Sequence, residues 1–170
     1  IVLLCFPSLA LGEENLLKNA DFEAVDAGLP ADWFEDAYYM STTASSFALE
    51  ADGYSGSCIR VTNLTENDAR FMQTVSVEPD TTYKITCLCR AEGIPEGSIG
   101  ATISIKDTFS YSESLTDTNG EWVPLTLYGK TGSCTLLYAG LAYRSPIQRQ
   151  FLHATVKYST AGTSKIVFCR

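Results

Sequence analysis

The sequence predicts an all-β sandwich, and two patterns along its 170 residues carry this prediction. Apolar and polar residues alternate over several short runs, which is the period expected of a strand with one buried face. The runs follow one another at near-regular spacing between turn residues such as Gly, Asn, Asp and Pro, and no window keeps a helical period. Short strands spaced in this way are typical of two packed antiparallel sheets.

The strands can be placed in order along the chain. An opening strand is expected at residues 15–17, followed by a tight turn at Phe22 and Glu23. The later alternating runs cover residues 47–50, 58–62, 71–77, 83–90, 101–105 and 123–127. In the clearest of them Gln73 points inward with the apolar side chains, whereas Met72 points outward.

Composition excludes two classes of partner. Hydrophobic residues make up 45% of the chain and charged residues 19%, which is ordinary for a single globular domain. The net charge of −8 at pH 7 argues against binding to nucleic acid or to an anionic membrane surface, because both need a basic face.

The charge is unevenly distributed along the chain. Residues 1–130 hold all 20 acidic residues and seven of the 12 basic ones, whereas residues 131–170 hold five basic residues and no acidic one. An acid-free run of this length is unusual in an ordinary globular composition. We therefore divide the chain into a sandwich at residues 13–130 and an atypical tail at residues 131–170.

The first twelve residues resemble the apolar core and small-residue cleavage end of a secretory signal peptide. The apolar run is too short to span a bilayer, and the alternative is a buried strand. As the remnant of a signal peptide, residues 1–12 predict a protein that is secreted or exposed on the extracytoplasmic cell surface. They also predict that the chain is a fragment of a longer protein.

Cysteine and histidine usage gives little support to catalysis. Without Cys5, five cysteines remain, an odd number that gives no complete disulfide framework. Cys87 and Cys89 lie two apart in one predicted strand, so buried thiols acting as small hydrophobes fit them better than a disulfide or a zinc site. The one histidine, His153, lies in the atypical tail and leaves the sandwich without a base for a Ser–His–Asp or Cys–His unit. No catalytic residue is predicted, and the chain is not expected to be an enzyme.

Several stretches within residues 15–130 resemble the secreted carbohydrate-binding modules that have a galactose-binding-like jelly-roll fold. The matching stretches are Asn15-Leu16-Leu17 through Phe22-Glu23, Gly28-Leu29-Pro30 with Trp33, Gly53 to Ser57 before Ile59 and Val61, Phe71 to Pro79, Thr82-Tyr83 through Arg90, and Gly120-Glu121-Trp122. The resemblance implies a jelly-roll β-sandwich of two antiparallel sheets that binds carbohydrate without catalysis. It also implies a polysaccharide or cell-surface glycan as partner and an appended catalytic or membrane domain.

The end of the chain departs from this pattern. Modules of this kind finish with a strand that carries an aromatic-Asp-Asp motif and pairs with the opening strand, and residues 131–170 contain no such motif. One explanation is a reading frame that shifts near Gly132, which leaves the jelly roll incomplete at its C-terminal end. The other is a divergent but genuine end, in which residues 136–138 and 165–168 form strands.

The resemblance also implies a structural calcium ion, because Glu23 sits where such modules place one carboxylate ligand. Calcium takes several oxygen ligands, and backbone carbonyls of the turn at residues 53–57 would add others. The alternative is that Asp21 and Glu23 are solvated turn acids, since one carboxylate rarely holds calcium alone.

Sugar rings have apolar faces and hydroxyl edges, so their binding sites combine aromatic side chains with fixed polar groups. The candidate ligand contacts are the aromatic residues Trp33, Tyr38, Tyr39 and Tyr111 and the polar residues Arg70, Gln73 and Arg90. Trp122 is a further aromatic available for sugar contact, and it also fits the cap of a strand end. Trp33 also fits the core, and the inward-facing Gln73 also fits a structural role because a buried amide needs hydrogen-bond partners.

The sequence thus favours non-catalytic carbohydrate binding by a secreted or cell-surface module. Two alternatives stay open. The first is a structural or adhesive ectodomain that spaces or docks another domain. The second is the N-terminal fragment of a larger membrane glycosyltransferase or secreted glycoside hydrolase.

Overall fold

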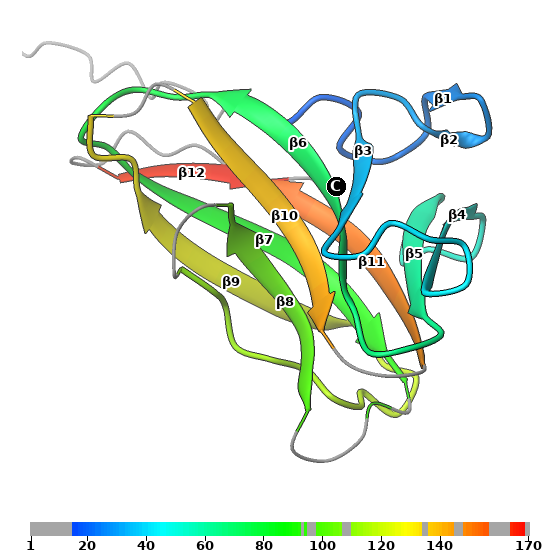
Figure 1. The fold of residues 1–170 in the computed structure, drawn as a ribbon. Helices are drawn as coiled ribbons and strands as arrows, with labels where there is room; N and C mark the ends of the chain where they lie inside the picture. Colours follow the sequence, from blue (N-terminus) through cyan, green and yellow to red (C-terminus); the bar gives the residue numbers. More distant parts are fainter. Residues whose placement is uncertain are drawn as a thin grey trace, which may run out of the picture.

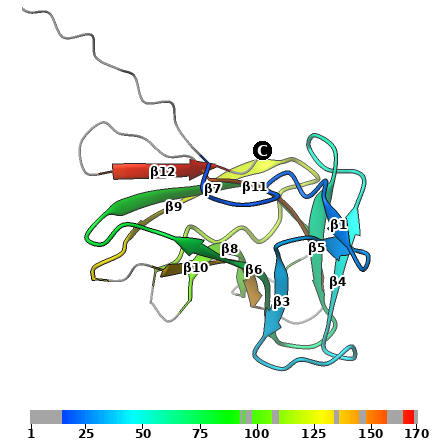
Figure 2. The same cartoon turned by 90° about the horizontal axis from the view of Figure 1, so that it is seen from above.

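The computed structural model describes residues 15–92, 94, 98–106, 110–133, 136–144, 148–156 and 164–168. The predicted signal segment 1–12 and the cysteines Cys5, Cys134 and Cys169 lie outside these residues. Figure 1 shows two layers of strands, and Figure 2 shows the same layers from above.

The described residues form strands and no helix, which confirms the predicted all-β class. The strands are β1 (Val25–Asp26), β2 (Leu29–Pro30), β3 (Phe34–Ala37), β4 (Ser45–Glu50), β5 (Cys58–Asn63), β6 (Asp68–Ser76), β7 (Thr82–Ala91), β8 (Ile99–Ile105), β9 (Val123–Lys130), β10 (Leu136–Arg144), β11 (Gln148–Val156) and β12 (Ser164–Phe168). Across the described ranges, no helix has the length and apolar character needed to cross a membrane.

Two sheets make up the sandwich. The four-stranded sheet has the order β3-β6-β10-β8, and the six-stranded sheet has the order β12-β7-β11-β5-β4, with β9 also paired to β7. The strand pairs are antiparallel except that β12 runs parallel to β7. The short strands β1 and β2 form a separate hairpin beside the sandwich (Figure 1).

The six alternating runs predicted from residue 47 to residue 127 are the strands β4 to β9. Residues 136–138 and 165–168 are also strands, at the start of β10 and within β12. Because β10 lies between β6 and β8, and β11 between β5 and β7, the residues beyond 131 supply inner strands to both sheets. The division of the chain at residue 130 stays a prediction.

The predicted opening strand is wrong, because residues 15–24 form bends and turns. The Lys18 N–H donates to Gln73 Oε1 over 2.8 Å, and Gln73 Nε2 donates to the Lys18 carbonyl over 2.9 Å. One side chain thus makes both backbone hydrogen bonds that a neighbouring strand would otherwise make. Asn19, at φ 42°, then turns the chain, and its side chain binds the backbone of Ala24.

The core lies between the two sheets and is built from alternate residues of both. Its largest fully buried apolar side chains are Phe22, Ile59, Val61, Phe71, Tyr83, Ile103 and Leu125. One prediction needs correction: Met72 faces away from this core, as expected, but it is fully buried. Its cross-strand neighbour on β3 is Phe34, and side chains paired across strands in this way pack against each other.

The cysteines behave as predicted where they are described. Cys58, Cys87 and Cys89 are all buried thiols. Burial raises the pKa of the Cys87 thiol well above its ordinary value, and burial together with the charge of Asp52 raises the pKa of Cys58 to about 12. Such thiols stay protonated at neutral pH and act as small apolar side chains.

Candidate functional site

The outer face of the four-stranded sheet is the side that points away from the core. On β6, Ala69 and Phe71 belong to the core, so Arg70 and Met72 point outward. Across the strand pair, Asp36 lies opposite Arg70 and Phe34 opposite Met72. By the same alternation the outer face includes Phe34, Asp36, Asp68, Arg70, Met72, Thr74, Thr102 and Ser104, of which Met72, Thr102 and Ser104 are buried.

Gly140 occupies the middle of this outer face. It pairs with Met72 of β6 on one side and with Ser104 of β8 on the other, while its neighbour Ala139 lies in the core. A glycine inside a strand is often a place where a ligand or another backbone approaches closely. Met72 and Ser104, the residues paired with Gly140 on its two sides, are both buried, so solvent does not reach the side chains at the centre of the outer face.

Aromatic residues border the outer face at both edges. Phe34, on the edge strand β3, is 43% exposed, and Tyr111 is 56% exposed. Tyr111 pairs with Ser104 in an isolated bridge, so its side chain lies on the same side of the sheet as that of Ser104. Exposed aromatic rings such as these are suited to contact with sugar rings.

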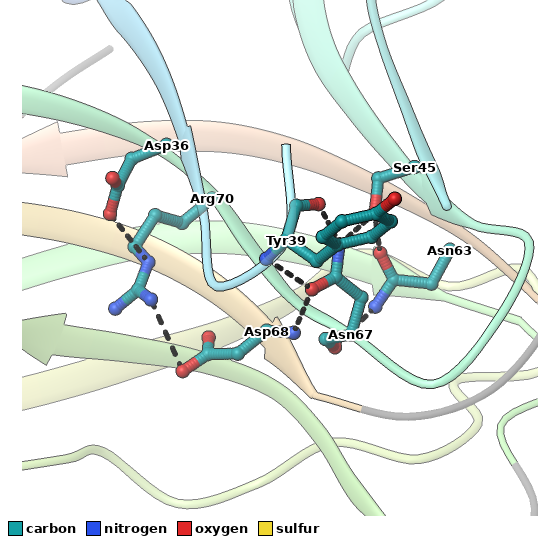
Figure 3. A network of polar contacts seen from close by, with 7 residues as sticks. All are labelled: Asp36, Tyr39, Ser45, Asn63, Asn67, Asp68 and Arg70. Carbon is teal, nitrogen blue, oxygen red and sulfur yellow. Dashed lines mark hydrogen bonds and ion pairs between the residues drawn. The ribbon is translucent and has the colours of Figure 1, made fainter. Parts of the chain in front are cut away.

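Arg70 is fixed on the outer face by two carboxylates. Its Nε lies 3.2 Å from Asp36 Oδ2 and its Nη2 lies 3.2 Å from Asp68 Oδ2, as Figure 3 shows. Surface ion pairs of this kind contribute only about 0–1 kcal/mol to stability. Their main consequence here is geometric, because they hold a guanidinium and two carboxylates as donors and acceptors at one place on the sheet.

Next to this cluster the loop after β3 carries two exposed tyrosines, of which Tyr38 is the most exposed aromatic residue of the described chain. Tyr38 is 90% exposed, Tyr39 63% and Met40 56%. Tyr38 N–H donates to the Asp68 carbonyl over 2.9 Å, so Tyr38 continues the alternation of Phe34 and Asp36 on the outer face.

The loop is held by the buried side chain of Asn67. Tyr39 N–H donates to Asn67 Oδ1 over 3.1 Å, and Asn67 Nδ2 donates to the Tyr39 carbonyl over 2.9 Å (Figure 3). Asn67 Nδ2 also donates to Ser45 Oγ, Ser45 Oγ donates to Asn63 Oδ1, and each of these two distances is 2.7 Å. Asn63 Nδ2 closes the network on the Asn67 carbonyl. Buried amides with this many partners fix the backbone of the tyrosine loop.

Three of the predicted ligand contacts, Tyr38, Tyr39 and Arg70, lie together on or beside the outer face where β3 pairs with β6. The fourth, Tyr111, lies at the opposite edge of the same sheet, beside β8. The role of Asn67 in holding the tyrosine loop was not predicted from the sequence. The polar loop at residues 63–68, with an asparagine close to each end, was a signal for local hydrogen bonding.

Three predicted contacts lie elsewhere. Trp33 is buried, with its ring centroid 5.3 Å from that of Phe22 and its Nε1 donating to the Asn19 carbonyl over 3.0 Å. Gln73 is buried and bound to the opening segment. Arg90 belongs to the six-stranded sheet, where it is paired with Asp52. Trp33 and Gln73 thus have the structural roles that the sequence also allowed.

The donor set around Glu23 does not fit a calcium site. Glu23 Oε1 already accepts a hydrogen bond of 2.7 Å from the Ser57 N–H. Gly56, at φ 75°, lies so close that a Cβ there would collide with the Glu23 carboxylate. Within the part of the chain that the structure describes, no three Asp, Glu, His or Cys side chains gather to hold a metal ion. Calcium normally takes six to eight oxygen ligands, and here one carboxylate serves the turn directly.

Comparison with known structures places this fold. The family 11 carbohydrate-binding module of the cellulosomal cellulase Lic26A-Cel5E of Clostridium thermocellum matches 93% of this chain and 95% of its own, with 12% identity and a TM-score of 0.56. The same kind of module in complex with a β-1,3-1,4-mixed-linked tetrasaccharide matches with 13% identity over 93% of this chain and 96% of its own, also at 0.56. TmCBM61 in complex with β-1,4-galactotriose matches 82% of this chain and 94% of its own, with 15% identity and a TM-score of 0.50.

No protein-family model and no curated protein matches the chain. The structural matches confirm the predicted jelly-roll β-sandwich at the level of the fold. The chain has the architecture of carbohydrate-binding modules.

Proposed function

We propose that this chain is a non-catalytic module that binds carbohydrate on the outer face of the four-stranded sheet. The observation that supports the proposal is the position of Tyr38 and Tyr39 beside the Arg70 cluster. The rings are solvent-exposed, and the Arg70 guanidinium is held between Asp36 and Asp68. Apolar ring faces next to fixed donors and acceptors match the two kinds of surface that a sugar presents.

The shared architecture supports the same function, because the matched modules were solved with β-1,4-galactotriose and with a β-1,3-1,4-mixed-linked tetrasaccharide. Binding would use stacking and hydrogen bonds, with no bond made or broken. In the protein as a whole, the module would hold a polysaccharide or cell-surface glycan near an appended catalytic or membrane domain, outside the cytoplasm.

The test is calorimetric titration of the chain with these two oligosaccharides, preceded by affinity electrophoresis against a panel of soluble polysaccharides. We expect at least one polysaccharide to retard the chain. Each of the variants Tyr38→Ala and Tyr39→Ala should weaken binding by about tenfold, which corresponds to roughly 1.4 kcal/mol.

Tyr128→Ala is the matched control, because Tyr128 is 61% exposed but lies on β9 of the other sheet, with Lys84 Nζ 6.0 Å from its ring centroid. Its binding should equal that of the unchanged chain. Absence of binding to every polysaccharide at high protein concentration would refute the proposal and favour a structural or adhesive ectodomain.

A further inference from the structure

A second cluster of aromatic and charged residues lies on the other sheet. On β7, Cys89 and Ala91 belong to the core, so Arg90 points to the outer side of the six-stranded sheet. Around it gather Asp52 and Tyr54 from the connection between β4 and β5 and Trp122 from the residue before β9. We call Asp52, Tyr54, Arg90 and Trp122 the Trp122 cluster.

The Trp122 cluster has a fixed cation and an accessible carboxylate. Arg90 Nη2 lies 2.8 Å from Asp52 Oδ2, and the side chains of Arg90 and Asp52 are 17% and 64% exposed. The Arg90 Cζ lies 5.1 Å from the centroid of the Trp122 ring, which is a cation–π distance. The guanidinium therefore orients both Trp122 and Asp52, while the Asp52 carboxylate stays open to solvent.

Tyr54 adds an exposed ring on a rigid turn. It is 63% exposed, and its ring lies edge to face with Trp122 at a centroid distance of 6.5 Å. The turn is closed by the Gly53 N–H, which donates to the Gly56 carbonyl over 2.9 Å, and by the bond from Ser57 to Glu23. A binding residue on a preorganised turn loses little conformational freedom when a ligand arrives.

We propose that the Trp122 cluster is a second carbohydrate-binding site. Two neighbouring aromatic rings offer surface for a pyranose ring, the Asp52 carboxylate accepts hydrogen bonds from sugar hydroxyls, and the Arg90 guanidinium donates them. That the ligand is a carbohydrate rests on the proposed function. The location of this second site goes beyond it.

The two sites lie on opposite sides of the sandwich. Arg70 and Arg90 belong to different sheets, and each points away from the core between the sheets. Figure 2 shows the two layers that separate them. Two sites on one module allow it to join two glycan chains, or to hold one polysaccharide more tightly by avidity.

The two tryptophans provide a selective test, because Trp33 is buried in the core while Trp122 is half-buried at the proposed site. We would titrate the chain with β-1,4-galactotriose, with the mixed-linked tetrasaccharide and with each polysaccharide that retards the chain in electrophoresis. Tryptophan fluorescence emission is followed during each titration. We expect a saturable change that disappears in Trp122→Phe, whose only tryptophan is Trp33. Tyr54→Ala should weaken the same transition by about tenfold.

The double variant Tyr38→Ala/Tyr39→Ala separates this proposal from the proposed function. A retained emission change in that variant supports the second site, including when binding at the first face fails. Calorimetric binding without any change in Trp122 emission, or an emission change abolished by the double tyrosine variant, would overturn it. Thermal unfolding of each variant confirms that it is folded. If Trp122→Phe is unstable, Tyr54→Ala still tests the site, because Tyr54 is exposed.

Discussion

The two outer faces of the sandwich each present an arginine held by aspartate beside aromatic rings, but they hold those rings in different ways. Arg70 and Arg90 have equally exposed side chains at 17%, and each is paired with carboxylate oxygens. On the four-stranded sheet the tyrosine loop is fixed through its backbone by the buried Asn67. On the six-stranded sheet the Trp122 ring is fixed through its face by the guanidinium itself.

The two regions therefore present similar residues at the surface, but different contacts hold their aromatic rings in place. In the first region a buried amide network sets the loop, so the rings of Tyr38 and Tyr39 keep solvent on most of their area. In the second region Arg90 holds the Trp122 ring in place, so the loss of its charge changes the position of that ring directly. The order of the first region is therefore sensitive to substitutions in the interior, and that of the second to substitutions at the surface.

The strongest test of this contrast is Asn67→Ala. The substitution leaves the Tyr39 N–H and carbonyl and the Ser45 hydroxyl without their amide partner, and we expect it to lower the free energy of unfolding by about 3 kcal/mol. Urea unfolding measures this loss. Carbohydrate binding at the first face should fall as well, while the Trp122 emission change should persist at temperatures where the variant is folded.

Ser45→Ala is the matched control, because Ser45 belongs to the same buried network but makes no bond to Tyr39. It should destabilise the chain and leave the affinity of the folded fraction unchanged. An equal loss of affinity in both variants would mean that Asn67 acts only through global stability.

The next largest effect is expected from removing each arginine in turn. Arg90→Met should cost about 1–2 kcal/mol of stability, because an ion pair and a cation–π contact are lost together, and should shift Trp122 emission in the absence of ligand. Arg70→Met should cost about 0–1 kcal/mol and leave tryptophan emission unchanged. Fluorescence spectra and thermal unfolding compare the pair. Identical spectra for both variants would contradict the assigned role of Arg90.

Glu23 extends the comparison to the turn beneath Tyr54. Glu23→Ala removes the acceptor for the Ser57 N–H and should cost about 1 kcal/mol, with a weaker emission change on ligand addition. Glu23→Gln keeps an acceptor oxygen and removes the charge, so it should behave like the unchanged chain. A chelator should leave the melting temperature unchanged. A drop in melting temperature with chelator, together with a Glu23→Gln variant as unstable as Glu23→Ala, would instead establish a metal at this turn.

The strands were predictable because alternation in β5 to β9 directly reports which residues face the core. The opening segment was not, because its backbone hydrogen bonds go to the Gln73 side chain, a partner 55 residues away from Lys18. Sequence patterns record the polarity of a residue but not which distant group will satisfy it.

The sites divide in the same way. Exposed tyrosines and paired arginines could be chosen from residue type alone, whereas the buried Asn67 and its partner Asn63 could not. Asn63 begins an Asn-x-Thr sequon, a pattern that indicates a surface acceptor, yet the folded chain buries it completely and uses its amide to bind the Asn67 carbonyl. Burial, which decides between these roles, is a property of the packed sheets and not of the local sequence.

The smallest expected effect on stability comes from the carboxylate of Glu35, on the strand β3 that precedes the tyrosine loop. Glu35 lies on β3 between Phe34 and Asp36 and opposite the core residue Phe71, and burial raises its pKa above the ordinary value. The folded chain therefore holds this proton more tightly than the unfolded chain does. Stability is greatest where the carboxyl is protonated and falls as the pH rises from the pKa of the unfolded carboxyl through the raised pKa of the folded one, which is a penalty for the charged form.

Glu35→Gln removes that penalty and should raise the melting temperature slightly at pH 7, with the gain fading below the pKa of the unfolded carboxyl. Thermal unfolding from pH 3 to pH 8 compares Glu35→Gln with the unchanged chain. A gain that grows toward low pH would mean that the Glu35 carboxylate is stabilised in the folded chain, and the first region would then contain a second favourable charge pairing besides that of Arg70.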